Sequence, residues 1–143
     1  MSYGVDLADG FARLLDAAGV GVYRTDGPYA PGETAITVAM LPPAPDRALC
    51  LSLYPVADSA ALTDTTTGLQ VRVRAAADPR EAEVLADRVH DVLHASGPHV
   101  FGEARVQLVF RVSAGPIGAD SAGRWERTAN YHCRAHRAHP NLE

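Results

Sequence analysis

The chain has 143 residues, 47% of them hydrophobic and 21% charged, a composition that fits one globular domain with a real core and excludes a disordered tail. Its formal net charge of −4 argues against a protein that wraps nucleic acid, because such binding needs a basic surface that neutralises phosphates. All 13 basic residues are arginine, which excludes P-loop phosphate chemistry, Schiff-base chemistry and lysine general bases.

A first helix is predicted near the N-terminus, with Asp6 as its N-cap. Apolar side chains recur after it at helical spacing, namely Leu7, Phe11, Leu14, Leu15 and Ala18. Gly19 followed by Val20 predicts a Schellman ending, in which a left-handed glycine closes the helix and Val20 contacts Leu15. A short strand over residues 21–23 comes next, and then a loop over residues 24–33 that is rich in Gly, Pro and Asp.

Three strands are predicted in the middle of the chain. Residues 34–41 and 48–54 are apolar runs with β-branched residues, separated by the prolines of "PPAPDR", and we expect them to be adjacent strands. Residues 55–68 are polar and are predicted to form a long irregular connection. The stretch that follows alternates, so we expect Leu69, Val71, Val73 and Ala75 to face inward and Gln70, Arg72 and Arg74 to face outward.

A second helix is predicted directly after this strand. Asp78, Pro79 and Glu81 occupy its N-cap, N1 and N3 positions, which is a capping box in all but the hydroxyl. Its apolar face consists of Ala82, Leu85, Val89, Val92 and Leu93. Gly97-Pro98 is expected to stop the helix.

Two more strands are predicted in the C-terminal part. In "ARVQLVFRV" the expected inward residues are Val106, Leu108, Phe110 and Val112, and the outward ones are Arg105, Gln107 and Arg111. A turn-rich stretch over residues 113–123 leads to "RWERTANYHCR", which points Trp125, Ala129, Tyr131 and Cys133 one way.

These elements predict an α+β fold with a single mixed, mainly antiparallel sheet and two principal helices packed on it. We expect one domain over residues 1–135 and a flexible C-terminal tail over residues 136–143. In the core, between helices and sheet, we expect to find Phe11, Leu15, Val73, Val89 and Phe110.

The cellular setting is predicted from what the chain lacks. No apolar run approaches the roughly 20 residues of a membrane span, and "MSYGVDLADG" lacks the basic and apolar blocks of a signal peptide. We therefore expect a soluble protein made in the cytoplasm, with no membrane association. In that reducing compartment Cys50 and Cys133 are expected to be free, mostly buried thiols.

Side chains suited to catalysis or metal binding are sparse. His90 and His94 are one helical turn apart, as in a zinc protease helix, but that motif needs a glutamate where this chain has Asp91, and a third ligand. By helical wheel both histidines should lie on a solvated face. No serine occupies a nucleophile elbow. We therefore expect no enzyme and no cofactor.

A second group of metal-ligand types lies near the C-terminus, namely His132, Cys133, His136 and His139. These residues fall where a strand ends and the terminus frays, so adventitious binding is favoured over a built metal site. A small metal-binding protein that uses His90 and His94, or this C-terminal cluster, is the alternative from a different functional class.

Four stretches, taken in order, resemble a known family. They are "LLDAAGVGVY", "GPYAPGETAITVAMLPPAPDRALCLSLYP", "LQVRVRAAADPREAEVLADRVHDVLH" and "GPIGADSAGRWERTANYHCR". With this order and spacing the chain resembles the bacteriophage minor capsid proteins that are also described as tail terminators of long-tailed phages. The resemblance spans nearly the whole chain and is more specific than any one of its short motifs.

The resemblance implies a structural virion protein. Membership would mean a small α+β subunit that assembles as a six-membered ring on the end of the tail tube, stops tube polymerisation and presents a surface to the head-completion proteins. The implied location is the head-proximal end of the tail, after assembly in the host cytoplasm. The implied partners are further copies of the chain, the tail tube protein and a head-completion protein, while DNA passes through the lumen without specific binding. A head-completion or tail-tube subunit is the alternative within phage structure.

The candidate interface residues come from this sequence alone, because the family supplies no catalytic residue and no contact motif. Arg72 and Arg74 on one strand, joined by Arg105 and Arg111 on another, are predicted to face another protein subunit. Guanidinium groups suit that role because they form directional, bidentate pairs with carboxylates. The alternative for these arginines is the solvated face of an antiparallel sheet.

Overall fold

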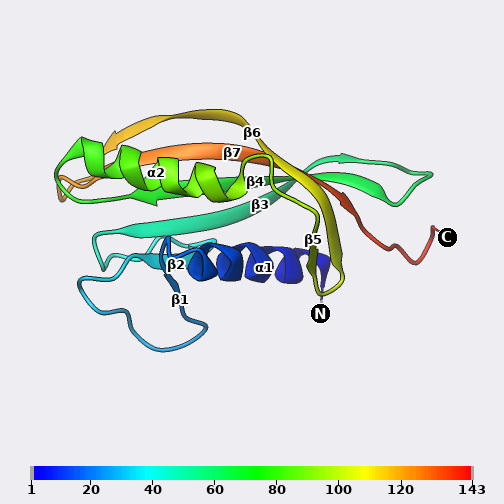
Figure 1. Cartoon of the computed structure of the whole chain (residues 1–143), viewed down its shortest axis with the longest axis horizontal. Coiled ribbons are helices and arrows are strands. Elements are labelled where there is room, and N and C mark those ends of the chain that lie inside the picture. Colours follow the sequence, from blue (N-terminus) through cyan, green and yellow to red (C-terminus); the bar gives the residue numbers. More distant parts are fainter. Residues whose placement is uncertain (1, 143) are drawn as a thin grey trace.

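Residues 2–142, which a computed structural model describes, form two helices and one seven-stranded sheet (Figure 1). The elements are α1 (Tyr3–Ala17), β1 (Val22–Tyr23), β2 (Ala35–Val38), β3 (Ala48–Asp58), β4 (Asp64–Arg74), α2 (Pro79–Leu93), β5 (His99–Phe101), β6 (Ala104–Ala119) and β7 (Trp125–His136). The predicted α+β class is therefore confirmed.

The sheet has the strand order β1-β2-β3-β4-β7-β6-β5. The pairs β1–β2 and β2–β3 are parallel, and the other neighbours are antiparallel, so the sheet is mixed and mainly antiparallel, as predicted. The edge strands β1 and β5 both contact α1, and the sheet curls into a half-barrel around that helix. Helix α2 packs on β4, β6 and β7 from the same side, which leaves the other face of these strands without a helix among residues 2–142.

Helix α1 begins one turn earlier than predicted. Ser2 is the N-cap, and its hydroxyl accepts a hydrogen bond from the Val5 N–H at 3.2 Å, so the assignment of Asp6 as N-cap is wrong. Asp6 lies in the first turn, where its carboxylate accepts from the Glu103 N–H at 2.9 Å and so ties the β5–β6 turn to the helix. The predicted Schellman ending is confirmed: Gly19 has φ +78°, and the Val20 N–H donates to the Leu15 carbonyl at 3.0 Å.

Helix α2 follows its sequence signals closely. The Asp78 carboxylate accepts from the Arg80 N–H at 3.0 Å, and Pro79 is the first helical residue. The predicted apolar face is buried at Ala82, Leu85, Val89 and Leu93, and the helix ends at Leu93, shortly before Gly97. The cap residues therefore fix where this helix begins, and its apolar stripe fixes which face packs on the sheet.

The core lies between both helices and the inner face of the sheet. Four of the five predicted core residues, Phe11, Leu15, Val73 and Val89, are fully buried there. They are joined on the strands by Leu51, Leu69, Val71, Tyr131 and Cys133. Each fully buried side chain of this size contributes about 1.5–3 kcal/mol relative to an exposed one, so this side of the sheet supplies most of the stabilisation.

Two segments predicted as loops are strands. Residues 55–58 extend β3 and residues 64–68 begin β4, so the expected irregular connection is a long hairpin with a turn over residues 59–63. The hairpin extends beyond the helices at one end of the molecule, on the same side as the C-terminal segment (Figure 1). The turn-rich stretch after Val112 is likewise the second half of β6, paired with β7. Antiparallel partners satisfy the backbone groups of these polar residues, and local composition does not contain that information.

Strand β6 contains a β-bulge that overturns one core assignment. The register with β7 shifts between Val106 and Leu108, so Val109 points into the core while Leu108 and Phe110 point to the opposite face. The placement of Leu108, Phe110 and Val112 on the inner face is therefore wrong, because strict alternation was assumed along a strand that carries an extra residue.

Candidate protein interface

The side of the sheet without helices, which we call the open face, is formed by alternate residues of β3, β4, β7 and β6. The strand register places Arg72 opposite Thr128, Leu108 opposite Arg134 and Phe110 opposite His132 on this face. Directly opposed residues in an antiparallel pair project to the same side. The candidate arginines can therefore be sorted by the side on which each one lies.

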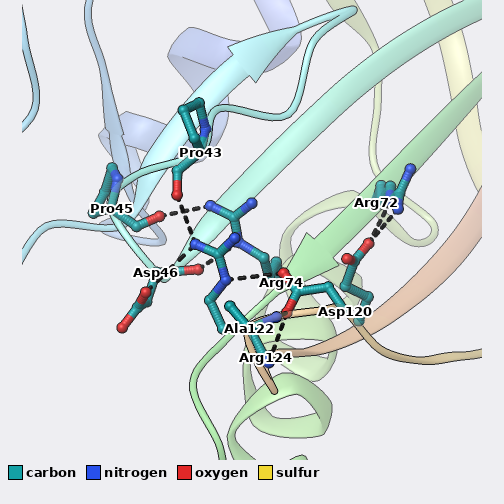
Figure 2. A network of polar contacts seen from close by, with 9 residues as sticks. Pro43, Pro45, Asp46, Arg72, Arg74, Asp120, Ala122 and Arg124 are labelled. Atoms are coloured by element: carbon teal, nitrogen blue, oxygen red, sulfur yellow. Dashed lines mark hydrogen bonds and ion pairs between the residues drawn. The ribbon is translucent and has the colours of Figure 1, made fainter.

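Arg74 projects to the open face with Arg72, as predicted, but it is buried there and does not face solvent. The side chain is 3% exposed, and its guanidinium donates to the carbonyl oxygens of Pro45 at 2.7 Å and Asp46 at 2.8 Å (Figure 2). Burial, and then the nearby Arg124 cation, lower the pKa of this guanidinium. The loop before β3 covers this end of β4, so strand alternation alone does not expose Arg74.

Arg72 forms an ion pair within the chain but stays partly exposed. Its guanidinium pairs with Glu126 across the strands, with both Nε and Nη2 at 2.5 Å from one carboxylate oxygen, and 44% of the Arg72 side chain stays exposed (Figure 2). Glu126 is 5% exposed, so this arginine stabilises a buried carboxylate that would otherwise be unpaired. Arg72 therefore belongs to the open face but holds a partner of its own.

Arg124, which the sequence reasoning did not select, completes this polar network. Its Nε donates to Asp120 within the β6–β7 turn, and its Nη1 donates to the Pro43 carbonyl at 2.6 Å (Figure 2). The Asp120 carboxylate also accepts the Arg124 and Ala122 N–H groups, and these hydrogen bonds lower its pKa. The Asp-x-x-x-Arg spacing in a Gly-containing turn was the available signal. The network locks the β2–β3 loop onto the β6–β7 turn.

Arg105 lies on the open face beside an aromatic and basic group of side chains. We define the open-face patch as Arg105, Leu108, Phe110, His132 and Arg134. The Arg134 guanidinium lies 5.3 Å from the Phe110 ring centroid, and the His132 ring meets that ring edge-on at 5.9 Å. Among residues 2–142, Arg105 and Arg134 form no ion pair with a carboxylate.

Arg111 lies on the helix side, opposite Tyr131 in the register. Its backbone N–H donates to the Nδ1 atom of His94 at 3.0 Å, and the His94 ring stacks on His90 at 4.5 Å. Burial first, then Arg111 and His94, lower the pKa of His90. His90 was expected on a solvated face, but it is half-buried against Tyr131 and its Nδ1 atom is buried without a hydrogen-bond partner.

The C-terminal histidines and Cys133 do not converge. Cys133 lies in the core, where burial raises the pKa of its thiol to about 12, while His132 lies on the open face. His136 bonds to the Thr63 hydroxyl at 2.7 Å, and His139 accepts from the Asn141 N–H. Within residues 2–142 no group of three or more His, Cys, Asp or Glu side chains is arranged to hold a metal ion. Cys50 and Cys133 are both buried free thiols.

One hollow of about 490 Å³ lies between the β3–β4 hairpin and the C-terminal segment. Its walls include Asp58, Asp64, Arg137, His139 and Leu142, and the Arg137 N–H joins the two segments by donating to the Thr63 carbonyl. The flexibility predicted for residues 136–143 stays a prediction. Across residues 2–142, neither helix combines the length and the apolar character that crossing a membrane requires.

Comparison with known proteins identifies the family. A solved chain from the virion of a native gene transfer agent particle has a TM-score of 0.66 at 18% identity, covering 91% of this chain and 94% of that one. A second solved chain has a TM-score of 0.62 at 19% identity, covering 95% and 96%. No curated protein sequence matches significantly. The family model for the bacteriophage tail terminator protein matches residues 14–137, and the chain therefore belongs to the bacteriophage tail terminator family.

Proposed function

We propose that this protein caps the phage tail tube as a six-membered ring, ends tube polymerisation and joins the tail to the head-completion complex. The observation that carries the proposal is the family match over residues 14–137, which includes α2 and every strand of the sheet. The family is one of phage tail structural proteins and not of enzymes. In this role the protein occupies the head-proximal end of the tail, after assembly in the host cytoplasm.

The fold offers what a ring subunit needs. A ring closes by heterologous contacts, in which one surface of a subunit meets a different surface of its neighbour. The open face and the outward side of α2 are two such surfaces, because they lie on opposite sides of the β4–β7 layer. Arg105 forms no ion pair among residues 2–142 and can pair with carboxylates of a partner. Arg111 is exposed on the helix side of β6, and the Arg72 side chain remains 44% exposed. Arg74 is withdrawn from the interface proposal because it is buried.

The charge of the chain suits a channel that DNA crosses. A terminator's lumen must let DNA pass without holding it, and strong holding requires a surface that neutralises many phosphates. The formal net charge of −4 and the absence of lysine oppose such binding. DNA therefore passes without specific contacts, while the ring binds the tail tube protein on one side and a head-completion protein on the other.

Electron microscopy of particles made without this gene tests the proposal. Tails should exceed their normal length and lack heads, because nothing stops tube growth and nothing joins the tube to the head. Supplying the wild-type gene from a plasmid should restore normal length and attachment, which is the control. Tails of normal length that merely lack heads would contradict a terminator role and favour the head-completion alternative. Absence of tails would favour a tube subunit.

A further inference from the structure

Charge is divided unevenly along this chain. Residues 104–142 contain six arginines and two carboxylates, a formal charge of +4, whereas residues 2–103 contain seven arginines and fourteen carboxylates, a charge of −7. Both carboxylates of the basic part are already paired, Asp120 with Arg124 and Glu126 with Arg72. The β6–β7 hairpin is therefore a basic element on an otherwise acidic subunit.

The basic element exposes an apolar centre on the open face. Leu108 is 37% exposed, and Phe110 beside it is flanked by the His132 ring and the Arg134 guanidinium. Both residues are turned out of the core by the bulge after Val106, and bulges commonly re-aim side chains at functional sites. Aromatic residues and arginine are the residue types enriched at the centres of protein interfaces.

A complementary surface lies on the outward side of α2. Glu83, Asp87 and Asp91 are exposed, are spaced four residues apart and so form one stripe, next to Val84, which is 59% exposed. Within the described residues 2–142, none of these three carboxylates forms an ion pair, while the neighbouring Arg80 and Arg88 are bound to Asp78 and to the Gly19 carbonyl. Like charges at this spacing, with Asp91 at the negative end of the helix dipole, disfavour the helix itself.

We propose that the open-face patch of one copy docks on the α2 stripe of the next copy. Arg105 and Arg134 of one copy pair with Asp87 and Asp91 of the next. Phe110 and Leu108 of the first copy cover Val84 of the next. Because the two surfaces lie on opposite sides of the β4–β7 layer, the contact is head-to-tail, which is the type of contact that a ring repeats from copy to copy. The inference rests on the ring proposed above and names the contact that would build it.

Charge reversal on each surface tests this contact. In a sheet-face variant, Arg105→Glu with Arg134→Glu, both surfaces are acidic; in a helix-face variant, Asp87→Arg with Asp91→Arg, both are basic. Sedimentation velocity and mass photometry should show each variant alone associating at least about tenfold more weakly than the wild type, because like charges then face each other. An equimolar mixture should regain assembly, since each acidic surface now finds a basic one. The mixed assembly should be even-numbered and alternate the two variants.

The control is a matched reversal away from both surfaces, Arg13→Glu with Arg24→Glu, which should assemble like the wild type. Thermal unfolding checks that each variant is folded, and a neutral pair, Arg105→Gln with Arg134→Gln, provides a milder test whose assembly should weaken in the same direction. Wild-type-like rings from both charge-reversed variants, or a mixture that stays dissociated, would overturn the contact and leave the ring intact. A wild type that never self-associates, at any concentration or salt, would overturn the ring itself and this contact with it.

Discussion

The inner and open faces of this sheet present different chemistry on the same strands. On the inner face, β3, β4 and β7 contribute Leu51, Val71 and Tyr131 to a core closed by both helices. On the open face the same strands carry polar side chains, and their arginines have different surroundings. Arg74 is covered by a loop, Arg72 is paired with Glu126, and Arg134 lies over the Phe110 ring without an ion pair among residues 2–142. The comparison shows that strand register determines the side of the sheet on which a residue lies. Whether that residue is available to a partner depends on the loops and side chains that contact it.

Truncation of Phe11 should have the largest effect on stability. Its ring is fully buried and meets Phe101 edge-on at 5.2 Å, so Phe11→Ala should lower the free energy of unfolding by about 3–5 kcal/mol. Urea denaturation followed by circular dichroism measures this change. Phe11→Leu, which keeps more of the volume, serves as the control and should cost less. A loss below about 1 kcal/mol would show that the inner face does not supply the main stabilisation.

Removal of the buried arginine should come next. Arg74→Met keeps the length of the side chain but leaves the Pro45 and Asp46 carbonyls without their donor, and it should cost about 1–3 kcal/mol. The matched change Arg13→Met removes an exposed ion pair with Asp9 and should have a much smaller effect on the free energy of unfolding. Both are measured by the same urea titration. An equal or reversed order would show that burial does not distinguish these two arginines.

Acidification should weaken the inner face through His99. Burial lowers the pKa of His99 below its usual 6.5, and the ring stacks on Phe101 at 5.2 Å. The unfolded chain then binds more protons than the folded one, so this contribution is complete above pH about 6.5 and is lost as pH falls through the folded value. The unfolding free energy of His99→Gln should therefore fall less than that of the wild type between pH about 7 and 5. Parallel pH profiles for the two proteins would contradict this assignment.

The smallest effect on stability is expected on the open face. Phe110 is only half-buried, so Phe110→Ala should cost about 1 kcal/mol, far less than the same truncation at Phe11. In sedimentation velocity the variant should nevertheless associate more weakly than the wild type. A loss of unfolding free energy comparable to that of Phe11→Ala would show that Phe110 contributes to stability like a core residue. Unchanged association would remove it from the interface.

Local signals in the sequence were sufficient for the helices and for the inner face of β4. The caps, the helical spacing of Leu7, Phe11 and Leu15 and the alternation through Val71 each act within a few residues. The structure contains them except for the N-cap at Asp6 and the Glu81 half of the capping box, since the Glu81 carboxylate pairs with Arg47. The bulge in β6 could not be found in this way, because an extra residue is visible only in the pairing with β7. Phe110 was misplaced for that reason.

The candidate interface was less accessible to sequence reasoning than the fold. Arg72 and Arg74 have the same residue type and the same alternation, yet one is partly exposed and the other is covered by the loop of Pro45. Arg134 was not predicted as an interface residue, because residues 132–136 were interpreted only for the metal-ligand types His132, Cys133 and His136. Which arginines are free depends on contacts between segments far apart in the chain, such as Arg124 with Pro43.

The position of β7 has a consequence for how the subunit is made. This strand is the last one synthesised, yet it lies between β4 and β6 in the sheet. Until it leaves the ribosome, β4 has an unpaired edge and α2 has no β7 to cover, so the nascent chain cannot complete its core. Pairing distant segments is slow, and folding of this sheet is therefore expected to finish only after β7 has left the ribosome. A chain terminated before β7 would therefore lack the centre of its sheet and could not form the core described above.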